Sequence, residues 1–385
     1  MASQLNRRRL TAVFGTAVAA VAGGCMLPGQ ASDTPRGTPR ETVVALSNAP
    51  AVTPTPPTAQ APTPTTQPTP EPTPVPRLPV FYSPQYVIAG FAYETTRKAR
   101  WVADSLEREP IPWLVLETPS PLEETEVAAV HDPVYVQAVR TGQPRTLAES
   151  QGFTWDAKLY SAVLASNGGA VAAAIAALRS GSGRKDASGN GHTIRAAGSL
   201  SSGLHHAHRQ YGLGNCTFNG LALATRAALA AGARNVLIVD LDAHCGGGTN
   251  ELVGSDAHVW HVDVAVHTFD RYQPAPRQTL DVVQAARAYL PMVQRRLEQL
   301  PGRAPAFDLC IYNAGMDPFE RCPVGGLPGI TREVLDARER LVFAWCRAHG
   351  IPIAFVLAGG YLGPGLDEAG LAGLHRLTLQ AAATV

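Results

Sequence analysis

The sequence predicts an α/β fold: one large, doubly wound, mostly parallel sheet flanked by helices. Four short apolar runs have the length and composition of buried strands: 235–242, 259–267, 307–315 and 352–360. Helical patterns separate several of these runs, as crossover connections between parallel strands require. Polar residues follow each run, and ligands bind at that end of the strands in open α/β sheets.

The helices of the domain follow from the spacing of apolar residues and from end signals. Residues 97–108 carry Trp101, Val102 and Leu106 at helical spacing. Residues 157–178 are rich in alanine and predict a long buried helix. Residues 181–191, which are polar and rich in glycine, predict an exposed loop. Three further helices are expected: 121–130, 133–141 and 219–231.

The 385-residue chain divides into three predicted segments. Residues 1–25 resemble an export signal, because three arginines precede a short apolar stretch and Cys25 follows it as in a bacterial lipobox. Residues 26–78 are rich in proline and threonine and predict a disordered linker. Residues 79–385 have a globular composition and predict the folded domain. We therefore expect export and lipid anchoring at the cell envelope or outside it; a misassigned start would leave the protein cytoplasmic.

The charge balance narrows the class of partner. The formal net charge is +1, and no block of basic residues favours nucleic acid. Membrane attachment is expected through Cys25 alone.

Polar side chains at the ends of the apolar runs predict a metal site. Asp240, Asp242 and His244 alternate after the first run, so an extended backbone places them on one side. Two carboxylates and one imidazole suit a catalytic zinc with an open position. His267, Asp317 and Tyr361 follow the other runs. Any one of these residues could be a loop cap, but four strand ends together favour one site.

A histidine cluster precedes the first run. His205 and His206 are adjacent in a loop flanked by glycine, and His208 follows. A lone histidine is more often structural, whereas neighbouring histidines favour proton transfer beside a metal.

Four motifs in this order resemble the histone deacetylase and acetylpolyamine amidohydrolase family: GLHHA, DLDAHCGGG, NAGMD…GGL and AGGY. HDPVYVQAV, GLGNCTFNG and LAGLHRLTL support the resemblance, which covers about residues 80–380. It implies an arginase-like α/β fold and a deacetylase-like catalytic domain over 79–385. It also implies zinc-dependent removal of an acetyl or other acyl group from an amine such as acetyl-lysine or an acetylpolyamine.

The resemblance assigns roles to matching positions. Three match the ligands of one zinc ion, for which other divalent metals are alternatives: Asp242, His244 and Asp317. His205 and His206 match the paired catalytic histidines, and Asp240 matches the acidic partner of His205. Tyr361 matches the tyrosine that donates to the substrate carbonyl and then to the oxyanion. Gly359 and Gly360 let the backbone approach the site and place the Tyr361 ring, and both are expected at the substrate pocket.

The sequence departs from the family pattern at several positions. Gly247 stands where the family has an aspartate or asparagine that orients the second histidine, and no replacement can be identified from the sequence. Cys245 and Cys322 replace a histidine and an aspartate near the site. They would form either a disulfide or two separate buried thiols.

The predicted substrate pocket also departs from the family. Gly214 is followed by Asn215 where deacetylases often have an aromatic wall, and Tyr272 is expected to supply the opposite wall. Some relatives bind potassium through backbone carbonyls and a hydroxyl. Ala265 stands at that hydroxyl position, which leaves potassium open.

Two other functions remain alternatives. An arginase-like ureohydrolase with two manganese ions would need more carboxylates than Cys245, Gly247 and Cys322 provide. A surface protein that binds a ligand at the metal site without turnover is favoured by the missing partner at Gly247.

Overall fold

The computed structural model describes residues 77–90, 94–181 and 195–384. The predicted signal segment, Cys25 and nearly all of the predicted linker lie outside these ranges. The predicted loop 181–191 lies outside them as well, apart from its first residue, which ends a helix.

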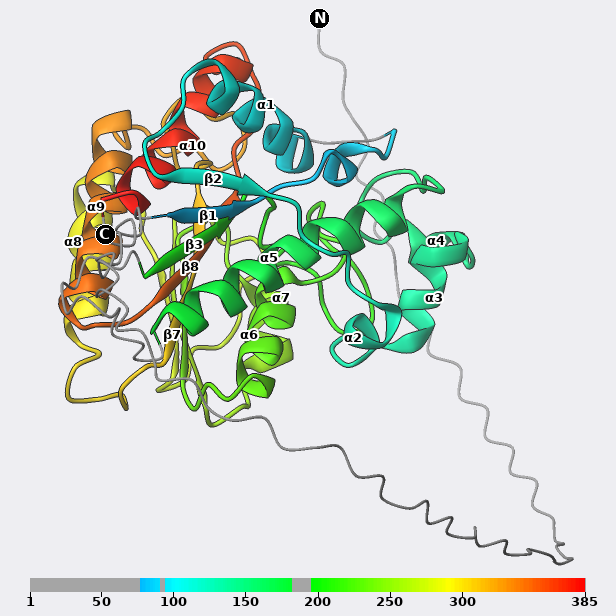
Figure 1. Cartoon of the computed structure of the whole chain (residues 1–385), viewed down its shortest axis with the longest axis horizontal. Helices are drawn as coiled ribbons and strands as arrows, with labels where there is room; N and C mark the ends of the chain where they lie inside the picture. Colours follow the sequence, from blue (N-terminus) through cyan, green and yellow to red (C-terminus); the bar gives the residue numbers. More distant parts are fainter. Residues whose placement is uncertain (1–76, 91–93, 182–194, 385) are drawn as a thin grey trace, which may run out of the picture. The chain divides into compact units, whose positions relative to one another are not determined.

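The sheet contains eight parallel strands in the described part of the chain, in the order β2-β1-β3-β8-β7-β4-β5-β6 (Figure 1). Helices lie on both faces, so the predicted fold class is confirmed. The strand bounds are β1 Leu78–Phe81, β2 Leu114–Glu117, β3 Ala196–Ser199, β4 Val236–Asp240, β5 Val259–Ala265, β6 Gln278–Val282, β7 Leu309–Gly315 and β8 Ile353–Ala358.

The four predicted strands correspond to β4, β5, β7 and β8, which lie in the centre and on one side of the sheet. The other four were not predicted because they are short and lack a long apolar run. β3, for example, is the four-residue stretch AAGS, and it is buried because neighbouring strands and helix α5 cover it.

The helices form two layers, one on each face of the sheet (Figure 1). One layer contains α1 (Glu94–Arg108), α8 (Ala286–Glu298), α9 (Arg332–Ala348) and α10 (Glu368–Ala382). The other contains α3 (Pro133–Thr141), α5 (Leu159–Gly181), α6 (Gly220–Ala230) and α7 (Gly247–Val253). Three short elements complete the described chain: η1 (Pro84–Val87), α2 (Glu124–Ala128) and α4 (Arg145–Ala148).

Helix α5 is long and apolar enough to cross a membrane by length and composition alone. In the structure it packs against α6, β3 and β8, and 56% of its apolar window is buried. The apolar character of this helix is therefore used in the core, as the sequence predicts.

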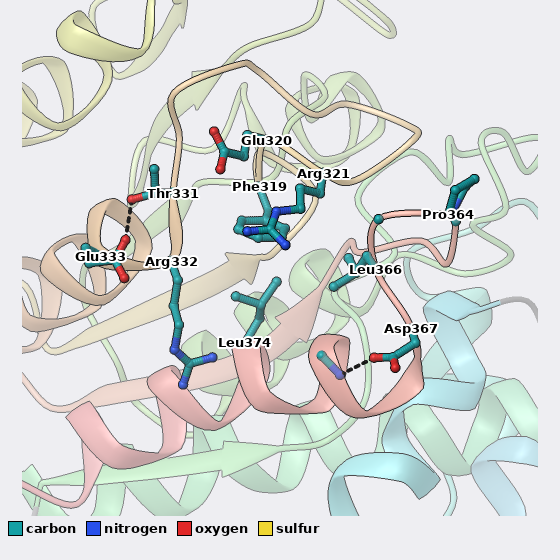
Figure 2. A pocket seen from close by; sticks show the side chains of 13 residues that line it. Phe319, Glu320, Arg321, Thr331, Arg332, Glu333, Pro364, Leu366, Asp367 and Leu374 are labelled. Carbon is teal, nitrogen blue, oxygen red and sulfur yellow. Dashed lines mark hydrogen bonds between the residues drawn. The ribbon is translucent and has the colours of Figure 1, made fainter.

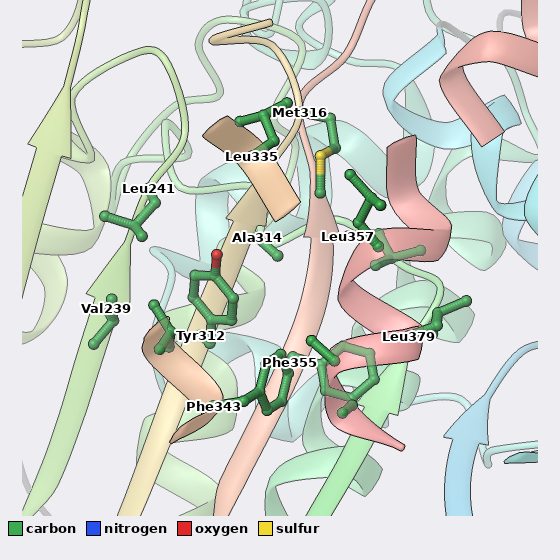
Figure 3. Close-up of a cluster of buried hydrophobic side chains, with 14 of the residues drawn as sticks. Val239, Leu241, Tyr312, Ala314, Met316, Leu335, Phe343, Phe355, Leu357 and Leu379 are labelled. Carbon is green, nitrogen blue, oxygen red and sulfur yellow. The ribbon is translucent and has the colours of Figure 1, made fainter. Parts of the chain in front are cut away.

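Strand β4 shows why both faces of the sheet are apolar. Leu237 and Val239 belong to the core beneath α8 to α10, and Val236 and Ile238 belong to the core beneath α5 and α6. Figure 3 shows Val239 and side chains of β7 and β8 beside Phe343 of α9 and Leu379 of α10. Because both faces of these strands are filled with apolar side chains, polar groups are concentrated at their carboxyl ends.

Candidate metal centre and active site

Two strand ends bring together the predicted metal ligands. Asp242 and His244 follow β4, and Asp317 follows its neighbour β7. His244 Nδ1 lies 3.1 Å from Asp242 Oδ1 and 3.1 Å from Asp317 Oδ2. Ligand atoms of the three buried residues all lie within 4.8 Å of one another. Asp317 Oδ2 is buried, and no contact to it among the described residues, including that of His244 Nδ1, has the geometry of a hydrogen bond. This donor set fits a metal ion, whose charge offsets the burial of two carboxylates.

Backbone contacts hold this group in place. The Ala243 amide donates to Asp317 Oδ1 at 3.0 Å, and the His244 amide donates to Asp242 Oδ1 at 3.0 Å. Gly359 has a φ of 53°, and a Cβ there would lie 2.2 Å from Asp317 Oδ1. The predicted close approach of the backbone at Gly359 is therefore present, behind the metal ligands.

A buried arginine supports the turns that carry the ligands. Arg338 of α9 donates from Nη1 to the Leu241 carbonyl at 3.2 Å, and its Nη2 lies 3.8 Å from Met316 Sδ. Leu241 and Met316 directly precede the ligands Asp242 and Asp317. The charge of Arg338 is balanced by Glu339, and both side chains are fully buried.

A buried lysine supports the same group from α1. Lys98 Nζ donates to the Gly359 carbonyl at 2.9 Å and is fully buried. Burial lowers its pKa to about 8, against the opposing effect of Asp242 and Asp317. No local motif in the sequence marks either Lys98 or Arg338.

The paired histidines form a chain of hydrogen bonds with Asp240. His205 Nδ1 lies 2.8 Å from Asp240 Oδ2, and His205 Nε2 lies 3.1 Å from His206 Nε2. Asp240 also accepts a hydrogen bond from Asn313 Nδ2 at 2.8 Å. The contact expected between His205 and Asp240 is therefore present in the structure.

The two histidines have different proton affinities. Burial opposes protonation of His205, but the charges of Asp240 and Asp242 outweigh it and raise its pKa to about 10. Burial and then the charge of His205 lower the pKa of His206 to about 4. His206 is therefore neutral at pH 7 and can accept a proton.

The structure supplies a partner for His206 that the sequence does not reveal. Asp270, in the loop after β5, places Oδ2 2.9 Å from His206 Nδ1. The two residues are 64 positions apart, and no local motif marks Asp270. The absence of a side chain at Gly247 therefore does not leave His206 without a carboxylate.

His208 also contacts Asp270. Its Nε2 is 3.1 Å from Asp270 Oδ1, its Nδ1 contacts Glu251, and its ring stacks on Tyr211 at 4.6 Å. These contacts direct both ring nitrogens to carboxylates, and His208 is not among the residues that line the pocket described next. These contacts make His208 a support for Asp270, and its expected part in proton transfer stays a prediction from the sequence.

A cavity of about 470 Å³ opens onto His206 and the metal ligand His244. The predicted pocket residues Gly214 and Asn215 line it, together with Tyr361. The remaining lining residues are His206, His244, His267, Phe269, Pro323, Val324 and Gly325. Phe269 is the aromatic wall, and its ring meets that of His206 edge to face at 4.9 Å.

Two predictions about the pocket wall are wrong. Tyr272 does not line the cavity, because its hydroxyl donates to the Thr279 carbonyl at 2.9 Å and its ring stacks on buried His261. The aromatic side chain in the pocket belongs to Phe269, three residues earlier. Gly359 and Gly360 lie behind the metal ligands and against Leu371 rather than in the wall.

Tyr361 lies in the same cavity as His206 and His244. Burial, and then the charges of Asp317 and Asp242, raise the pKa of Tyr361 well above its usual value. Its hydroxyl therefore stays protonated and can donate a hydrogen bond. The Tyr361 amide donates to Cys322 Sγ at 3.3 Å, which helps to fix the backbone after β8.

The cysteines near the site are separate free thiols, so the disulfide alternative is wrong. Cys245 Sγ donates to the His267 carbonyl at 3.3 Å, whereas Cys322 Sγ donates to the Val324 carbonyl at 3.2 Å. Each thiol packs against a different loop of the pocket.

A larger cavity of about 660 Å³ lies between the loop after β7 and the start of α10 (Figure 2). It shares no lining residue with the first cavity. Two of its acidic side chains have local partners, since Asp367 accepts from the Gly370 amide and Glu333 accepts from Thr331. The metal ligands and paired histidines do not line this second cavity, so the first cavity is the candidate active site.

Comparisons with known proteins agree with this geometry. Residues 92–287, about half of the chain, match the histone deacetylase domain. An uncharacterized protein of Picosynechococcus sp. is 34% identical over 244 residues, which span 60% of this chain and 74% of that protein. Histone deacetylase 2 of Arabidopsis thaliana is 31% identical over 170 residues, which span 42% of this chain but only 43% of that protein.

The fold comparison reaches further along the chain. The crystal structure of an acetylpolyamine aminohydrolase from Burkholderia pseudomallei superposes with a TM-score of 0.62 and 17% identity. The match covers 79% of this chain and 98% of that structure, so the eight-stranded sheet with its two helical layers is a shared fold. The match to the family domain, together with the Picosynechococcus relative, shows that this chain belongs to the histone deacetylase family.

Proposed function

We propose that the chain is a zinc-dependent amide hydrolase that removes an acetyl or other acyl group from an amine. The observation that carries the proposal is the placement of the buried Asp242–His244–Asp317 group beside a cavity that also contains His206 and Tyr361. The family supports an enzyme that hydrolyses amides. The zinc ion and the substrate are our inference from the donor set and the cavity.

The proposed chemistry divides between the metal and the side chains. When bound by Asp242, His244 and Asp317, zinc would polarise the amide carbonyl and increase the acidity of water. Neutral His206 would accept a proton and later return one to the leaving amine. The Tyr361 hydroxyl would donate a hydrogen bond to the carbonyl oxygen as negative charge develops there.

The outer wall of the cavity favours a substrate in which an uncharged chain leads to the acyl-amide group. Asn215, Phe269, Pro323 and Val324 line it, and none of the described residues that line the cavity carries a carboxylate. Phe269 and Val324 are 38% and 46% exposed, so they form an apolar entrance. We propose that an acyl-lysine side chain, whose arm is a neutral methylene chain, fits better than an acylpolyamine that carries a further positive charge.

A substrate comparison tests this proposal on the purified full chain loaded with zinc. Turnover of an acetyl-lysine peptide is expected to exceed turnover of acetylputrescine, and Asp242→Ala should abolish both because it removes a ligand. Zinc bound without turnover of either substrate would contradict the proposed activity. A preference for acetylputrescine would contradict only the proposed preference for an acyl-lysine side chain.

A substitution at Gly359 tests whether its backbone positions the metal ligands. In Gly359→Ala, the added Cβ would lie 2.2 Å from Asp317 Oδ1 and 2.8 Å from Asp242 Oδ2. The carboxylates must move, and we expect zinc affinity to fall by about 10- to 100-fold, as for other changes around metal ligands. Zinc affinity is measured by competition with a chelating dye.

The matched control is Gly232→Ala. Gly232 also has a positive φ, of 101°, but a Cβ there would meet nothing within 4 Å. The control therefore has the backbone strain without the contact. Equal zinc affinity in the two variants would show that the Gly359 backbone does not position the ligands.

The alternative functions receive less support from the described residues. One group of Asp, His, Glu or Cys residues is close enough to hold an ion in the described part of the chain, whereas a ureohydrolase of the arginase type would need a second. The non-catalytic alternative depended on a missing partner for His206, and Asp270 now contacts that histidine. Export and lipid anchoring through Cys25 remain proposals from the sequence of residues 1–25.

A further inference from the structure

We propose that Asp270 is the positioning residue for His206 and takes the place of the side chain that position 247 lacks. The inference deepens the proposed function and rests on it for its kinetic test. It starts from one contact, the 2.9 Å separation of Asp270 Oδ2 and His206 Nδ1. A carboxylate at this nitrogen fixes the ring orientation and keeps Nε2, which lies 3.1 Å from His205 Nε2, as the nitrogen that can accept a proton.

The carboxylate of Asp270 is itself held firmly. Oδ2 also accepts a hydrogen bond from the Gly248 amide at 3.2 Å, and Oδ1 lies 3.1 Å from His208 Nε2. His208 is held in turn by Glu251. Only 8% of the Asp270 side chain is exposed. Each oxygen therefore has a fixed partner, and rotation of the carboxylate would break contacts on both sides.

Gly247 and Asp270 exclude one another sterically. A Cβ at Gly247 would lie 2.4 Å from Asp270 Oδ1 and 2.4 Å from the Asp270 carbonyl oxygen. A side chain at position 247 and the present Asp270 side chain would therefore compete for one space. Position 247 must therefore be glycine for Asp270 to occupy its present place, and the missing side chain does not indicate a lost function.

The backbone at Asp270 is unusual in a way that suits this role. Its φ of 57° lies in the left-handed region, which aspartate adopts more often than most residues other than glycine, but still at a cost in backbone strain. Such strain persists where surrounding contacts fix it, often at functional sites. The neighbouring loop supplies those contacts, because the Cys245 amide donates to the Phe269 carbonyl at 3.0 Å and the His267 amide donates to the Ala243 carbonyl at 2.8 Å.

The kinetic test uses Asp270→Gly in the zinc-loaded full chain. Glycine tolerates the positive φ, so the substitution removes the carboxylate without adding strain. We expect kcat to fall by about 10- to 100-fold, the usual effect of losing a group that orients an active-site ligand or histidine. KM should change little because Asp270 does not line the pocket. An unchanged kcat would overturn the proposal.

A rescue experiment separates positioning from general structural support. Gly247→Asp alone should lower kcat because its Cβ collides with Asp270. In the double variant Gly247→Asp/Asp270→Gly, the contact with the Asp270 side chain is gone, and glycine at position 270 gives the backbone freedom to move its carbonyl oxygen away from the new Cβ. The new carboxylate then enters the vacated space, and kcat should rise about tenfold above that of Asp270→Gly. A double variant as slow as Asp270→Gly, with zinc bound and the fold intact, would contradict the proposal.

Two further variants control the comparison. Asp270→Asn keeps an oxygen that can accept from His206, so it should retain more activity than Asp270→Gly. Asp256→Gly also removes a carboxylate that accepts a backbone hydrogen bond, from His258 at 2.9 Å, but without contact to His206. It should leave kcat unchanged. If Asp256→Gly slows the enzyme as much as Asp270→Gly, the loss is structural.

An independent readout does not require turnover. A proton on His206 Nδ1 that is hydrogen-bonded to a carboxylate should give a downfield imidazole resonance in the proton NMR spectrum, assigned by its loss in His206→Gln. The resonance should be absent in Asp270→Gly and should return in the double variant. Its persistence in Asp270→Gly would overturn the inference. An inactive wild-type chain that shows the expected resonance pattern would instead contradict the proposed function alone.

Discussion

Replacing Tyr361 with phenylalanine is expected to lower kcat by about 100- to 1000-fold, the usual effect of removing one donor to a developing oxyanion. The reason lies in the protonation of the side chain. Burial and the charges of Asp317 and Asp242 raise the pKa of Tyr361 well above its usual value, so the hydroxyl remains a donor at neutral pH. Phenylalanine keeps the ring in the cavity and removes only that hydrogen bond.

The measurement is steady-state kinetics on the zinc-loaded full chain with an acetyl-lysine peptide. Zinc content should be unchanged, because Tyr361 is not among the three grouped ligands. Tyr82→Phe is the matched control, since Tyr82 packs edge to face on Tyr86 at 5.7 Å and does not line the cavity. A Tyr361→Phe variant with the same kcat as the control would show that the Tyr361 hydroxyl takes no part in the reaction.

The second large effect concerns stability. Arg338→Met is expected to lower the free energy of unfolding by about 3–5 kcal/mol, because it leaves a buried carboxylate without its cation. Among the described residues, Glu339 would keep the hydrogen bond from the Tyr312 hydroxyl, at 2.8 Å. The Leu241 carbonyl and the Tyr289 hydroxyl oxygen would each lose the hydrogen bond that Arg338 Nη1 donates at 3.2 Å. Urea-induced unfolding measures the change.

Another arginine of the same helix provides the control. Arg340 pairs with Asp336 at 2.8 Å, but its side chain is 71% exposed, so Arg340→Met should change stability little. Replacing both buried charges, in Arg338→Met/Glu339→Gln, should recover part of the loss because no unpaired charge remains. An Arg338→Met chain as stable as Arg340→Met would show that the buried pair does not support the ligand turns.

The sequence predicted those parts of the fold that depend on local pattern. Strands β4, β5, β7 and β8 are continuous apolar runs, and parallel strands covered on both faces produce such runs. β3 could not be predicted, because AAGS becomes a strand only when its neighbours in space cover it. The alternation of Asp240, Asp242 and His244 likewise predicted one side of the site from spacing alone.

Other features of the site depend on how distant loops meet. Asp317 reaches Asp242 because β7 pairs with β4, an adjacency that no spacing in the sequence reveals. Asp270 reaches His206 from a left-handed backbone conformation in the loop after β5, which no local motif marks. The same backbone conformation explains the error at Tyr272, because a change of direction within the loop brings Phe269 rather than Tyr272 to the cavity.

Removal and return of the metal tests the central claim most directly. We expect the full chain, stripped of metal by a chelator, to lose hydrolysis of the acetyl-lysine peptide and to regain it in proportion to added zinc. Recovery should be complete at about one ion per chain, as one group of three ligands requires. Hydrolysis that persists at full rate in the metal-free chain would contradict the account.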